Sequence, residues 1–254
     1  MLESNENSVS LRHDFDVSGY CIMPLPSIEE QQWLYAFVES KWLSALQSGY
    51  PGIEAEARRL GLSGYHGIAD KIDHGAFWTK DRRLFSPTEV DALLKELSVF
   101  RNLSSIFGNF KIEDIEGIGY PEVYWRLVRP GIANDVAIAH KDTWFYSITN
   151  GMSSEQQAGL VKVWLPVVTL VGGSGLAVSA GTHRIHIPHS SEIRHGRPKP
   201  TGDIAVLDTY PMTLLPLAVG QAVAFDTGLL HKGVAHTGDI TRVSIEFAIR
   251  LAVH

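Results

Sequence analysis

Cysteine is nearly absent from this sequence: Cys21 is the only one among 254 residues. A chain with a single thiol forms no internal disulfide and assembles no thiolate zinc site. The first fifteen residues, MLESNENSVSLRHDF, also lack the apolar core of a secretory signal peptide. Both features are typical of a protein from a reducing compartment, so we expect a cytoplasmic protein.

Long apolar runs are missing as well. No stretch reaches the roughly 18 apolar residues that a membrane helix needs, so no membrane segment is expected. Low-complexity tracts and repeats are also absent. Hydrophobic residues still make up 44% of the chain, which is enough for a sizeable core. A length of 254 residues then favours one domain over residues 1–254.

The chain has no excess of basic residues, since 22 Lys and Arg face 28 Asp and Glu. Nucleic-acid binding requires a clustered basic excess, so nucleic acid is not an expected partner. One stretch is an exception. It indicates either a solvated polar loop or the entrance to a site that receives an anionic substrate. Its members are Arg184, Arg194, Arg197 and Lys199, with His183, His186, His189 and His195 among them.

The first half of the chain predicts helices. Residues 1–12 read as a loose polar tail, followed by a short strand within 17–25. Ser27 with Glu30 three residues later forms a capping-box pattern, and apolar residues then recur at helical spacing as far as Gly49. We therefore expect a first long helix from Ser27 to Gly49.

A second helical region follows an irregular segment. Residues 49–80 are rich in glycine and aromatics without a clean period, and we interpret them as a segment that could cover a site. Ser86 with Glu89 forms another capping box, and the helix should continue, with a break, to Phe107. Residues 13–116 are thus expected to form a helical flank and a lid.

After Gly117 the pattern changes to short β-prone runs separated by turn residues, which predicts a mainly β sandwich or barrel over residues 117–254. The expected strands are 122–128, 136–140, 144–148, 160–171, 175–179, 204–207, 213–217, 221–226 and 242–252.

The main chemical motif is His140-Lys141-Asp142, directly after one of these runs. Residues two apart on an extended strand point to the same side, so the imidazole and the carboxylate can meet at one ion. His231 follows the run 221–226 and can supply a third ligand. Two histidines and one carboxylate form the facial triad of non-haem iron(II), which leaves positions open for a 2-oxo acid and O2.

Arg242 lies eleven residues after His231, and Ser244 follows two residues later. Both should lie on one face of the last long strand, where a guanidinium and a hydroxyl can bind the distal carboxylate of 2-oxoglutarate. Glu246 shares that face, while Val243, Ile245, Phe247 and Ile249 should point into the core.

With these motifs in place, the chain resembles the phytanoyl-CoA dioxygenase-like family of iron(II)- and 2-oxoglutarate-dependent oxygenases. The stretches that carry the resemblance are GYCIMPLPSIEEQ, HKDTWFY, VWLPVVTLVGGSGLAVSAGTHR and AVAFDTGLLHKGVAHTGDITRVS. The family's usual PGSH or PGTH reads AGTH here, and the loop before Trp164 is long for the family.

The resemblance implies a double-stranded β-helix, with iron bound by the two histidines and Asp142. It also implies that Arg242 holds 2-oxoglutarate with help from Ser244. Trp164 would line the co-substrate pocket, and Lys141 could reach it. Related halogenases carry Gly or Ala at the position of Asp142, so the intact carboxylate favours hydroxylation.

Substrate residues are less well defined by the sequence. Arg126 and Arg129, before the motif, are candidates for a substrate contact or for a surface ion pair. Trp78 and His74 could line a substrate pocket or support the structure. We expect a small-molecule substrate, anionic or amino-acid-like, and the sequence does not decide the oligomeric state.

A cupin-like isomerase or binding protein is the competing function, because the same β fold can carry a metal without oxidising anything. The carboxylate clamp of Arg242 and Ser244 argues against it, since such a protein has no use for 2-oxoglutarate.

Overall fold

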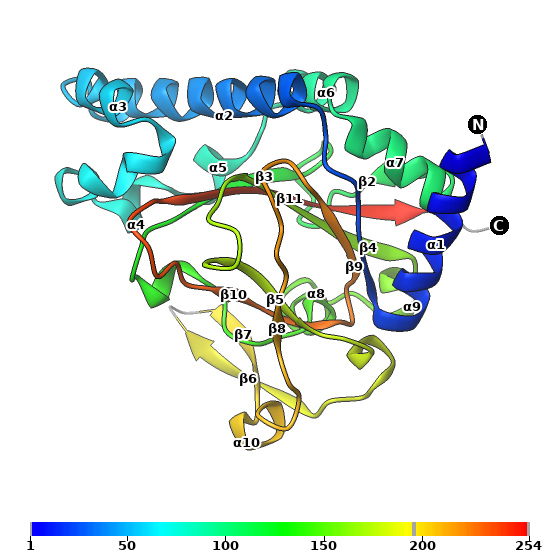
Figure 1. Ribbon diagram of the computed structural model, residues 1–254. Coiled ribbons are helices and arrows are strands. Elements are labelled where there is room, and N and C mark those ends of the chain that lie inside the picture. The colour runs from blue at the N-terminus through cyan, green and yellow to red at the C-terminus, as the bar shows by residue number, and fades with distance from the viewer. Residues whose placement is uncertain (1, 195–196, 253–254) are drawn as a thin grey trace.

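The computed structural model describes residues 2–194 and 197–252, except the side chains of 2–5, 194 and 197. Its centre is a six-stranded antiparallel sheet, shown in Figure 1, with the order β1-β9-β4-β11-β2, in which β3 also pairs with β11. The strands are β1 (Tyr20–Ile22), β2 (Phe110–Ile112), β3 (Val123–Val128), β4 (Leu160–Val168), β9 (Val223–Asp226) and β11 (Arg242–Leu251).

A smaller sheet lies on the other side, in the order β10-β5-β8. It contains β5 (Gly175–Ser179), β8 (Thr213–Leu214) and β10 (Leu230–Val234), and a separate hairpin joins β6 (His189–Arg194) to β7 (Arg197–Gly202). Hydrogen bonds do not close the two sheets into a barrel over the described residues. The arrangement confirms the expected double-stranded β-helix with amino-terminal helices.

Helices cover the outer face of the large sheet, where α2, α6 and α7 lie together in Figure 1. The longer helices are α1 (Leu2–Ser18), α2 (Ile28–Gly49), α3 (Glu54–Leu60), α6 (Pro87–Glu96), α7 (Ser98–Phe107) and α8 (Asp142–Asn150). The short ones are η1 (Leu62–Gly67), η2 (Ala69–Lys71), α4 (His74–Phe77), α5 (Lys80–Arg83), η3 (Ala133–Asp135), α9 (Ser154–Gln157), η4 (Thr182–Arg184) and α10 (Ile204–Leu207).

Both expected helix starts are confirmed, although their caps differ. Ser86 and Glu89 form a complete capping box. The side chain of Ser27 accepts a hydrogen bond from the amide of Glu30. The carboxylate of Glu30, however, accepts from the amide and hydroxyl of Ser98 at 2.7 and 2.8 Å. Glu30 therefore joins the start of α2 to the start of α7 instead of closing its own box.

Several local predictions were wrong. A loose tail was expected over residues 1–12, but residues 2–12 belong to helix α1, because Phe15 anchors this helix against Phe107 with ring centroids 4.9 Å apart. Residues 136–140 form no strand beyond a single bridge at His140.

Two expected strands are helices. Residues 144–148 lie in α8, since Trp144 is buried against Ile187 and Leu230 and this packing outweighs the β-propensity of the aromatics. Residues 204–207 form α10, whose first turn is capped by Asp203 accepting from the amide of Ala205.

The last strand, β11, has two different faces. Val243, Ile245, Phe247 and Ile249 belong to the main core beneath the helices. Arg242, Ser244 and Glu246 point to the opposite side and line a cavity between the sheets. This alternation was expected, and it places polar side chains at a fixed depth in a rigid strand.

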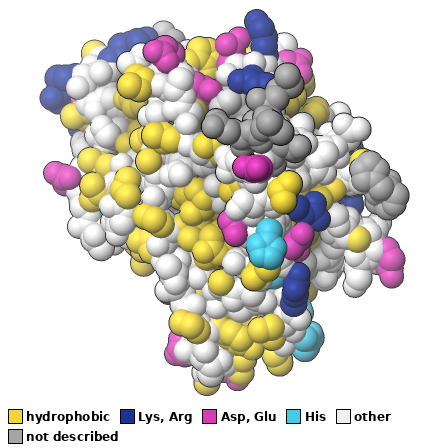
Figure 2. Space-filling view, turned by 45° about the vertical axis from the view of Figure 1, so that its right-hand side comes forward, with side chains coloured by type: hydrophobic (Ala, Val, Ile, Leu, Met, Phe, Trp, Pro, Cys, Tyr) yellow, Lys and Arg dark blue, Asp and Glu magenta, His cyan; other side chains and the backbone are white. Residues whose placement is uncertain are grey.

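No helix among the described residues is long and apolar enough to span a membrane. On the face shown in Figure 2, basic and acidic side chains are interspersed, and they do not form an extended patch of one sign.

Candidate metal centre and adjoining cavities

The two histidines of the predicted triad are brought together by main-chain pairing. His140 and His231 form an isolated antiparallel bridge, in which each amide donates to the other's carbonyl at 2.9 Å. Lys141 is extended, and Asp142 then begins α8. The change from an extended residue to a helix start turns the carboxylate of Asp142 to the same side as the imidazole of His140.

The three side chains form a compact and buried cluster. Their ligand atoms all lie within 4.8 Å of one another, and the residues are 5–9% exposed. The Oδ1 atom of Asp142 lies 3.7 Å from Nε2 of His140 and 4.0 Å from Nε2 of His231. Two imidazoles and one carboxylate at these separations suit a metal ion such as iron(II).

Main-chain carbonyls orient both rings. The Nδ1 atom of His140 lies 2.6 Å from the carbonyl of Ile138, and Nδ1 of His231 lies 2.9 Å from that of Leu229. Each carbonyl can only accept, so each Nδ1 carries the proton, and Nε2 is left as a lone-pair donor. Both histidines therefore present a metal-binding nitrogen toward Asp142.

Electrostatics keep the cluster in the protonation states that metal binding requires. Burial lowers the pKa of His231 to about 4, with a further contribution from His140, so the ring is neutral at neutral pH. Burial alone would raise the pKa of Asp142, but the neighbouring His231 and His140 outweigh it and lower that pKa. Asp142 is therefore a carboxylate.

A small cavity of about 100 Å³ adjoins the triad and contains the predicted co-substrate residues. Arg242 and Ser244 lie in its wall, 5% and 1% exposed, together with Trp164. The Nη1 atom of Arg242 donates to the carbonyl of Gly175 at 2.7 Å, and its guanidinium carbon lies 5.6 Å from the centre of the Trp164 ring. Burial and the nearby Arg126 lower the pKa of Arg242 to about 10, which leaves it charged at neutral pH.

Buried polar atoms in this cavity lack partners. Asp142 Oδ2, Arg242 Nε and Ser244 Oγ make no hydrogen bond with the described residues. Buried polar groups in native proteins are almost always paired, so these three atoms call for a ligand. A cation would satisfy Asp142, and a carboxylate would satisfy Arg242 and Ser244. The residues thus fit a metal ion with an anionic co-substrate.

A larger cavity of about 510 Å³ opens beside the small one. Arg126, His140, Asp142, Lys162 and Glu246 line both cavities. The metal cluster therefore lies in the wall between a small polar pocket and a space large enough for an organic molecule.

Lys141 does not reach either cavity, contrary to expectation. Its ammonium donates to the carbonyls of Thr182 and Ile185 at 2.6 and 2.7 Å. Adjacent residues of an extended segment point to opposite sides, so the geometry that aims His140 at the metal aims Lys141 away from it. Burial lowers the pKa of this ammonium to about 8.

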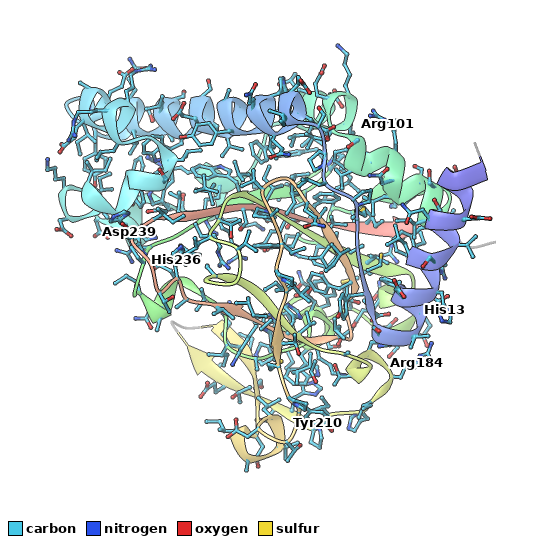
Figure 3. The ribbon with its side chains drawn as sticks, viewed as in Figure 1. His13, Arg101, Arg184, Tyr210, His236 and Asp239 are labelled. Atoms are coloured by element: carbon cyan, nitrogen blue, oxygen red, sulfur yellow. The ribbon has the colours of Figure 1, made fainter. Side chains whose placement is uncertain are left out.

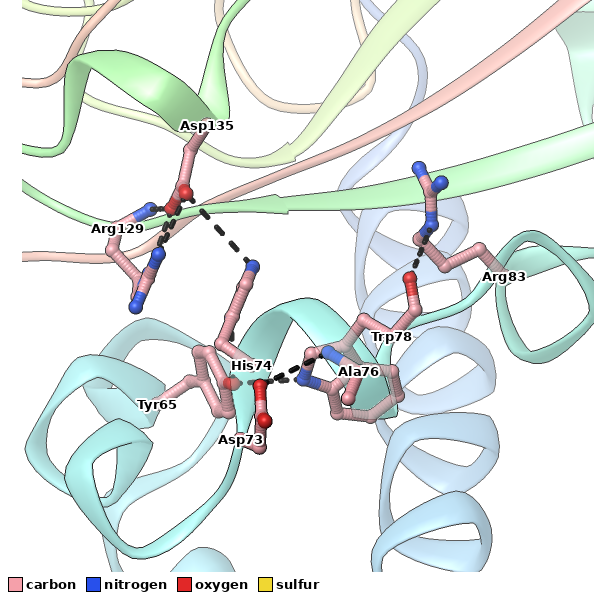
Figure 4. Close-up of polar contacts among 8 residues, drawn as sticks. All are labelled: Tyr65, Asp73, His74, Ala76, Trp78, Arg83, Arg129 and Asp135. Carbon is pink, nitrogen blue, oxygen red and sulfur yellow. Dashed lines mark hydrogen bonds and ion pairs between the residues drawn. The ribbon is translucent and has the colours of Figure 1, made fainter. Parts of the chain in front are cut away.

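The four candidate substrate residues separate into one that faces the site and three that do not. Arg126 lines both cavities and donates to Glu246 at 2.6 Å. Arg129 instead forms a bidentate ion pair with Asp135, as Figure 4 shows. His74 and Trp78 both bond to the hydroxyl of Tyr65 and support the fold behind the site.

Residues 49–80 cover little of the site. Lys80 is the only one of them in the wall of either cavity. Tyr65 and Ile68 are fully buried in the core, and the amide of His66 donates to the hydroxyl of Thr241. The segment is thus fixed next to Arg242 and does not lie over the metal cluster.

The described residues of the basic, histidine-rich stretch lie at two different places in the structure. His183, Arg184, His186 and His189 line a separate groove of about 740 Å³. Arg184 donates to the carbonyl of Asp16, so it lies beside α1 in Figure 3. Lys199 faces the larger cavity next to the metal cluster. His195 and the side chains of Arg194 and Arg197 lie outside the described residues.

Other residues around the metal cluster were not predicted from the sequence. Lys162 lies two positions before Trp164 on β4, and this spacing on a strand could have placed it on the cavity face. Phe145 contacts the ring of His140 edge-on, with centroids 5.0 Å apart, and Tyr146 is buried beside it. Both lie in α8, which was expected to be a strand, so their position could not be read from the sequence.

Comparisons with known proteins identify the fold. The chain is similar to EctD from S. alaskensis, solved with 2-oxoglutarate and 5-hydroxyectoine, at 14% identity and a TM-score of 0.58 over 94% of this chain and 74% of that one. It is also similar to SnoK, a non-heme alpha ketoglutarate dependent carbocyclase from nogalamycin biosynthesis, at 15% identity and 0.58 over 98% and 86%.

A third similar structure is the epimerase SnoN in complex with Fe3+, alpha ketoglutarate and nogalamycin RO, at 11% identity and 0.58 over 97% and 84%. No protein-family model and no curated protein matches the sequence. The structural neighbours are thus non-haem iron and 2-oxoglutarate proteins, and at these identities they establish the fold.

Proposed function

We propose that this protein is an iron(II)- and 2-oxoglutarate-dependent oxygenase that hydroxylates a small molecule, with succinate and CO2 as co-products. The observation that carries the proposal is the pairing of two features. A buried His140, Asp142 and His231 cluster adjoins a cavity in which Arg242 and Ser244 have unpartnered buried atoms.

The three ligand residues would hold iron(II) through two Nε2 atoms and a carboxylate oxygen. Bound iron with 2-oxoglutarate supplies the activation of O2 that substrate oxidation requires. The chain's own contribution is binding and orientation. The carbonyls of Ile138 and Leu229 fix the two rings, so the ligand set need not rearrange when the ion binds.

Arg242 and Ser244 would bind the distal carboxylate of the co-substrate. Arg242 is held by the carbonyl of Gly175 and the face of Trp164, and its Nε stays available for a carboxylate oxygen. The Ser244 hydroxyl, two residues away on the same face of β11, can donate to the second oxygen. Low exposure of both side chains excludes water and strengthens the interaction.

Hydroxylation is proposed as the outcome because Asp142 keeps its carboxylate. A carboxylate at this position occupies the coordination site that a halide would need. The fold itself does not select the outcome, since the similar proteins include a carbocyclase and an epimerase.

The test is anaerobic visible spectroscopy of the full chain with iron(II) and 2-oxoglutarate. We expect a weak charge-transfer band of the chelated 2-oxo acid, and we expect it to disappear in His140→Ala. Arg242→Gln should retain iron but require on the order of 100-fold more 2-oxoglutarate, because a buried charge pair loses one partner. Arg101→Gln, at an exposed arginine of α7, is the matched control and should behave as the wild type.

Iron binding without a band at any 2-oxoglutarate concentration would contradict the proposal. In that case the cupin-like isomerase or binding protein becomes the better description.

A further inference from the structure

The larger cavity shares part of its wall with the small one, so its contents lie next to the metal cluster. Asp142 and His140 supply that common wall, together with Arg126, Lys162 and Glu246. A volume of about 510 Å³ is within the range of sites for organic ligands, whereas about 100 Å³ suits only a small co-substrate. On the proposed function, the larger cavity is therefore the place for the molecule that is oxidised.

Some of the charges around this cavity neutralise one another. Lys80 forms an ion pair with Glu116, and Arg126 pairs with Glu246 at 2.6 Å. These two pairs leave the cavity wall with no net charge from their four side chains.

Three cationic side chains of the described residues remain in the wall. Lys162 and Lys199 form no ion pair with a carboxylate of the described residues, and Lys162 forms no hydrogen bond there either. Arg83 donates through Nε to the carbonyl of Trp78 at 3.1 Å, and its terminal nitrogens point away from that residue, as Figure 4 shows. Among the described residues of the wall, Glu122 is the one carboxylate left over apart from Asp142, and burial raises its pKa. With Asp142 assigned to the metal ion, the described side chains of the wall leave a net positive charge.

The same cavity also has an aromatic wall. Phe145 lies between His140, whose ring it contacts edge-on at 5.0 Å, and the ammonium of Lys199, which is 5.6 Å from the centre of the Phe145 ring. Tyr146 is 6% exposed, and its hydroxyl has no hydrogen-bond partner among the described residues. An apolar body could pack on Phe145 while an oxygen atom accepts from Tyr146.

We propose that the larger cavity takes a small organic anion, with a carboxylate or phosphate on an apolar body, anchored by Lys162, Lys199 and Arg83. Unpaired cations in a partly buried site attract and orient such a group through charge-assisted hydrogen bonds. The apolar body then lies against Phe145, beside the metal ligand His140. This inference rests on the proposed function for the identity of the site, and on the cavity's own charges for the class of ligand.

The experiment is isothermal titration calorimetry on the full chain, loaded anaerobically with iron(II) and kept in excess 2-oxoglutarate. The probes are 3-phenylpropanoate, phenyl phosphate and the neutral 3-phenylpropanamide. At least one anionic probe should bind, and the amide should bind about tenfold more weakly or not at all, because it lacks the charge. The two anionic probes separate carboxylate from phosphate recognition.

Variants locate the binding site. Lys162→Gln and Lys199→Gln should each weaken the preferred anion about tenfold, whereas Lys162→Arg, which keeps the charge, should restore binding. Lys95→Gln is the matched control, since Lys95 is exposed on α6 with an 82% accessible side chain. With 2-oxoglutarate raised until it saturates the variant, Arg242→Gln should weaken the probe far less than the two lysine variants do, because Arg242 lines the small cavity and not the larger one.

The proposal is overturned if no anionic probe binds or if the amide binds equally well. It is also overturned if Arg242→Gln abolishes probe binding while Lys162→Gln and Lys199→Gln retain it. Failure of the proposed function gives a different result: the charge-transfer band is absent, while the anionic probe still binds with the same dependence on Lys162 and Lys199.

Discussion

A buried network behind the metal site illustrates how single side chains set each other's protonation. Arg129 donates to both carboxylate oxygens of Asp135, and Nε2 of His74 lies 3.9 Å from the same carboxylate (Figure 4). Burial lowers the pKa of His74, and the charge of Arg129 adds to that shift more than Asp135 opposes it. His74 is therefore neutral at neutral pH and bonds to the hydroxyl of Tyr65 at 2.8 Å.

This state of His74 predicts a pH dependence of stability. Its pKa is lower in the folded protein than the usual 6.5, so the unfolded chain takes up the proton first as the pH falls. The free energy of unfolding should decrease as the pH falls below 6.5, until the folded protein is protonated too. His74→Gln should show a smaller decrease between pH 7 and pH 5, measured by urea unfolding at each pH. An exposed histidine on α1, His13, gives the control His13→Gln, and equal slopes for wild type and His74→Gln would contradict the prediction.

The residues of the metal cluster were predictable because their chemistry depends on sequence spacing. His140 and Asp142 lie two apart, Arg242 and Ser244 lie two apart, and both pairs share a side of the chain in the structure. Lys162, which also faces the small cavity, was missed although the same rule applied to it. Nothing in the sequence showed that Arg126 would form an ion pair with Glu246, whereas Lys162 forms none with the described residues.

Among the elements, helix α1 shows how a buried aromatic residue stabilises a helix that is otherwise mostly polar. The helix is polar over most of its length, and Phe15 is the buried residue among its described side chains, in edge contact with Phe107 of α7. The guanidinium of Arg12 lies 5.5 Å above the same Phe107 ring. Phe15 and Arg12 thus pack the amino-terminal helix against α7.

We expect Phe15→Ala to lower the free energy of unfolding by about 3 kcal/mol, the usual cost of removing a buried phenyl ring. Val9→Ala is the matched control on the same helix, since Val9 is 66% exposed and its replacement should change stability by less than about 0.5 kcal/mol. Both values come from urea unfolding followed by circular dichroism. A small effect of Phe15→Ala would mean that α1 is not coupled to the core.

Elements whose own sequence carries a capping box or turn residues at their ends were predicted well. Ser86 and Glu89 cap α6 as the sequence indicates, and β5 has the expected bounds. Helix α8 was missed because its sequence, DTWFYSITN, is β-prone, and its helical form depends on packing with residues distant in sequence. Hairpin β6–β7 was missed because both of its strands, HSSEIR and RPKPTG, are largely polar, and the second carries two prolines.

At the scale of the whole molecule, the site is assembled from parts that different sheets supply. Arg242 and Ser244 belong to β11 of the large sheet, whereas His231 belongs to β10 of the small one. A co-substrate that bridges the metal and Arg242 would therefore connect the two sheets.

We expect this connection to appear as cooperative thermal stabilisation. Iron(II) and 2-oxoglutarate together should raise the anaerobic melting temperature by more than the sum of their separate effects, because each improves the binding of the other. At a ligand concentration about 100 times its Kd, one ligand raises the free energy of unfolding by about 2.7 kcal/mol. Differential scanning fluorimetry measures the melting temperatures, and Arg242→Gln should remove the part of the shift that exceeds the sum. Additive shifts in the wild type would show that the two ligands bind independently.

The pairing of His140 with His231 has a consequence for chain entropy. Two main-chain hydrogen bonds close the long loop between these residues, and both join protein atoms alone. The entropic cost of closing this loop is thus offset by protein contacts during folding, before any ion binds. A small zinc domain, by contrast, folds only when its metal draws the ligands together. Here the ion would enter and leave a finished structure, and a chelator should empty the site without unfolding the chain.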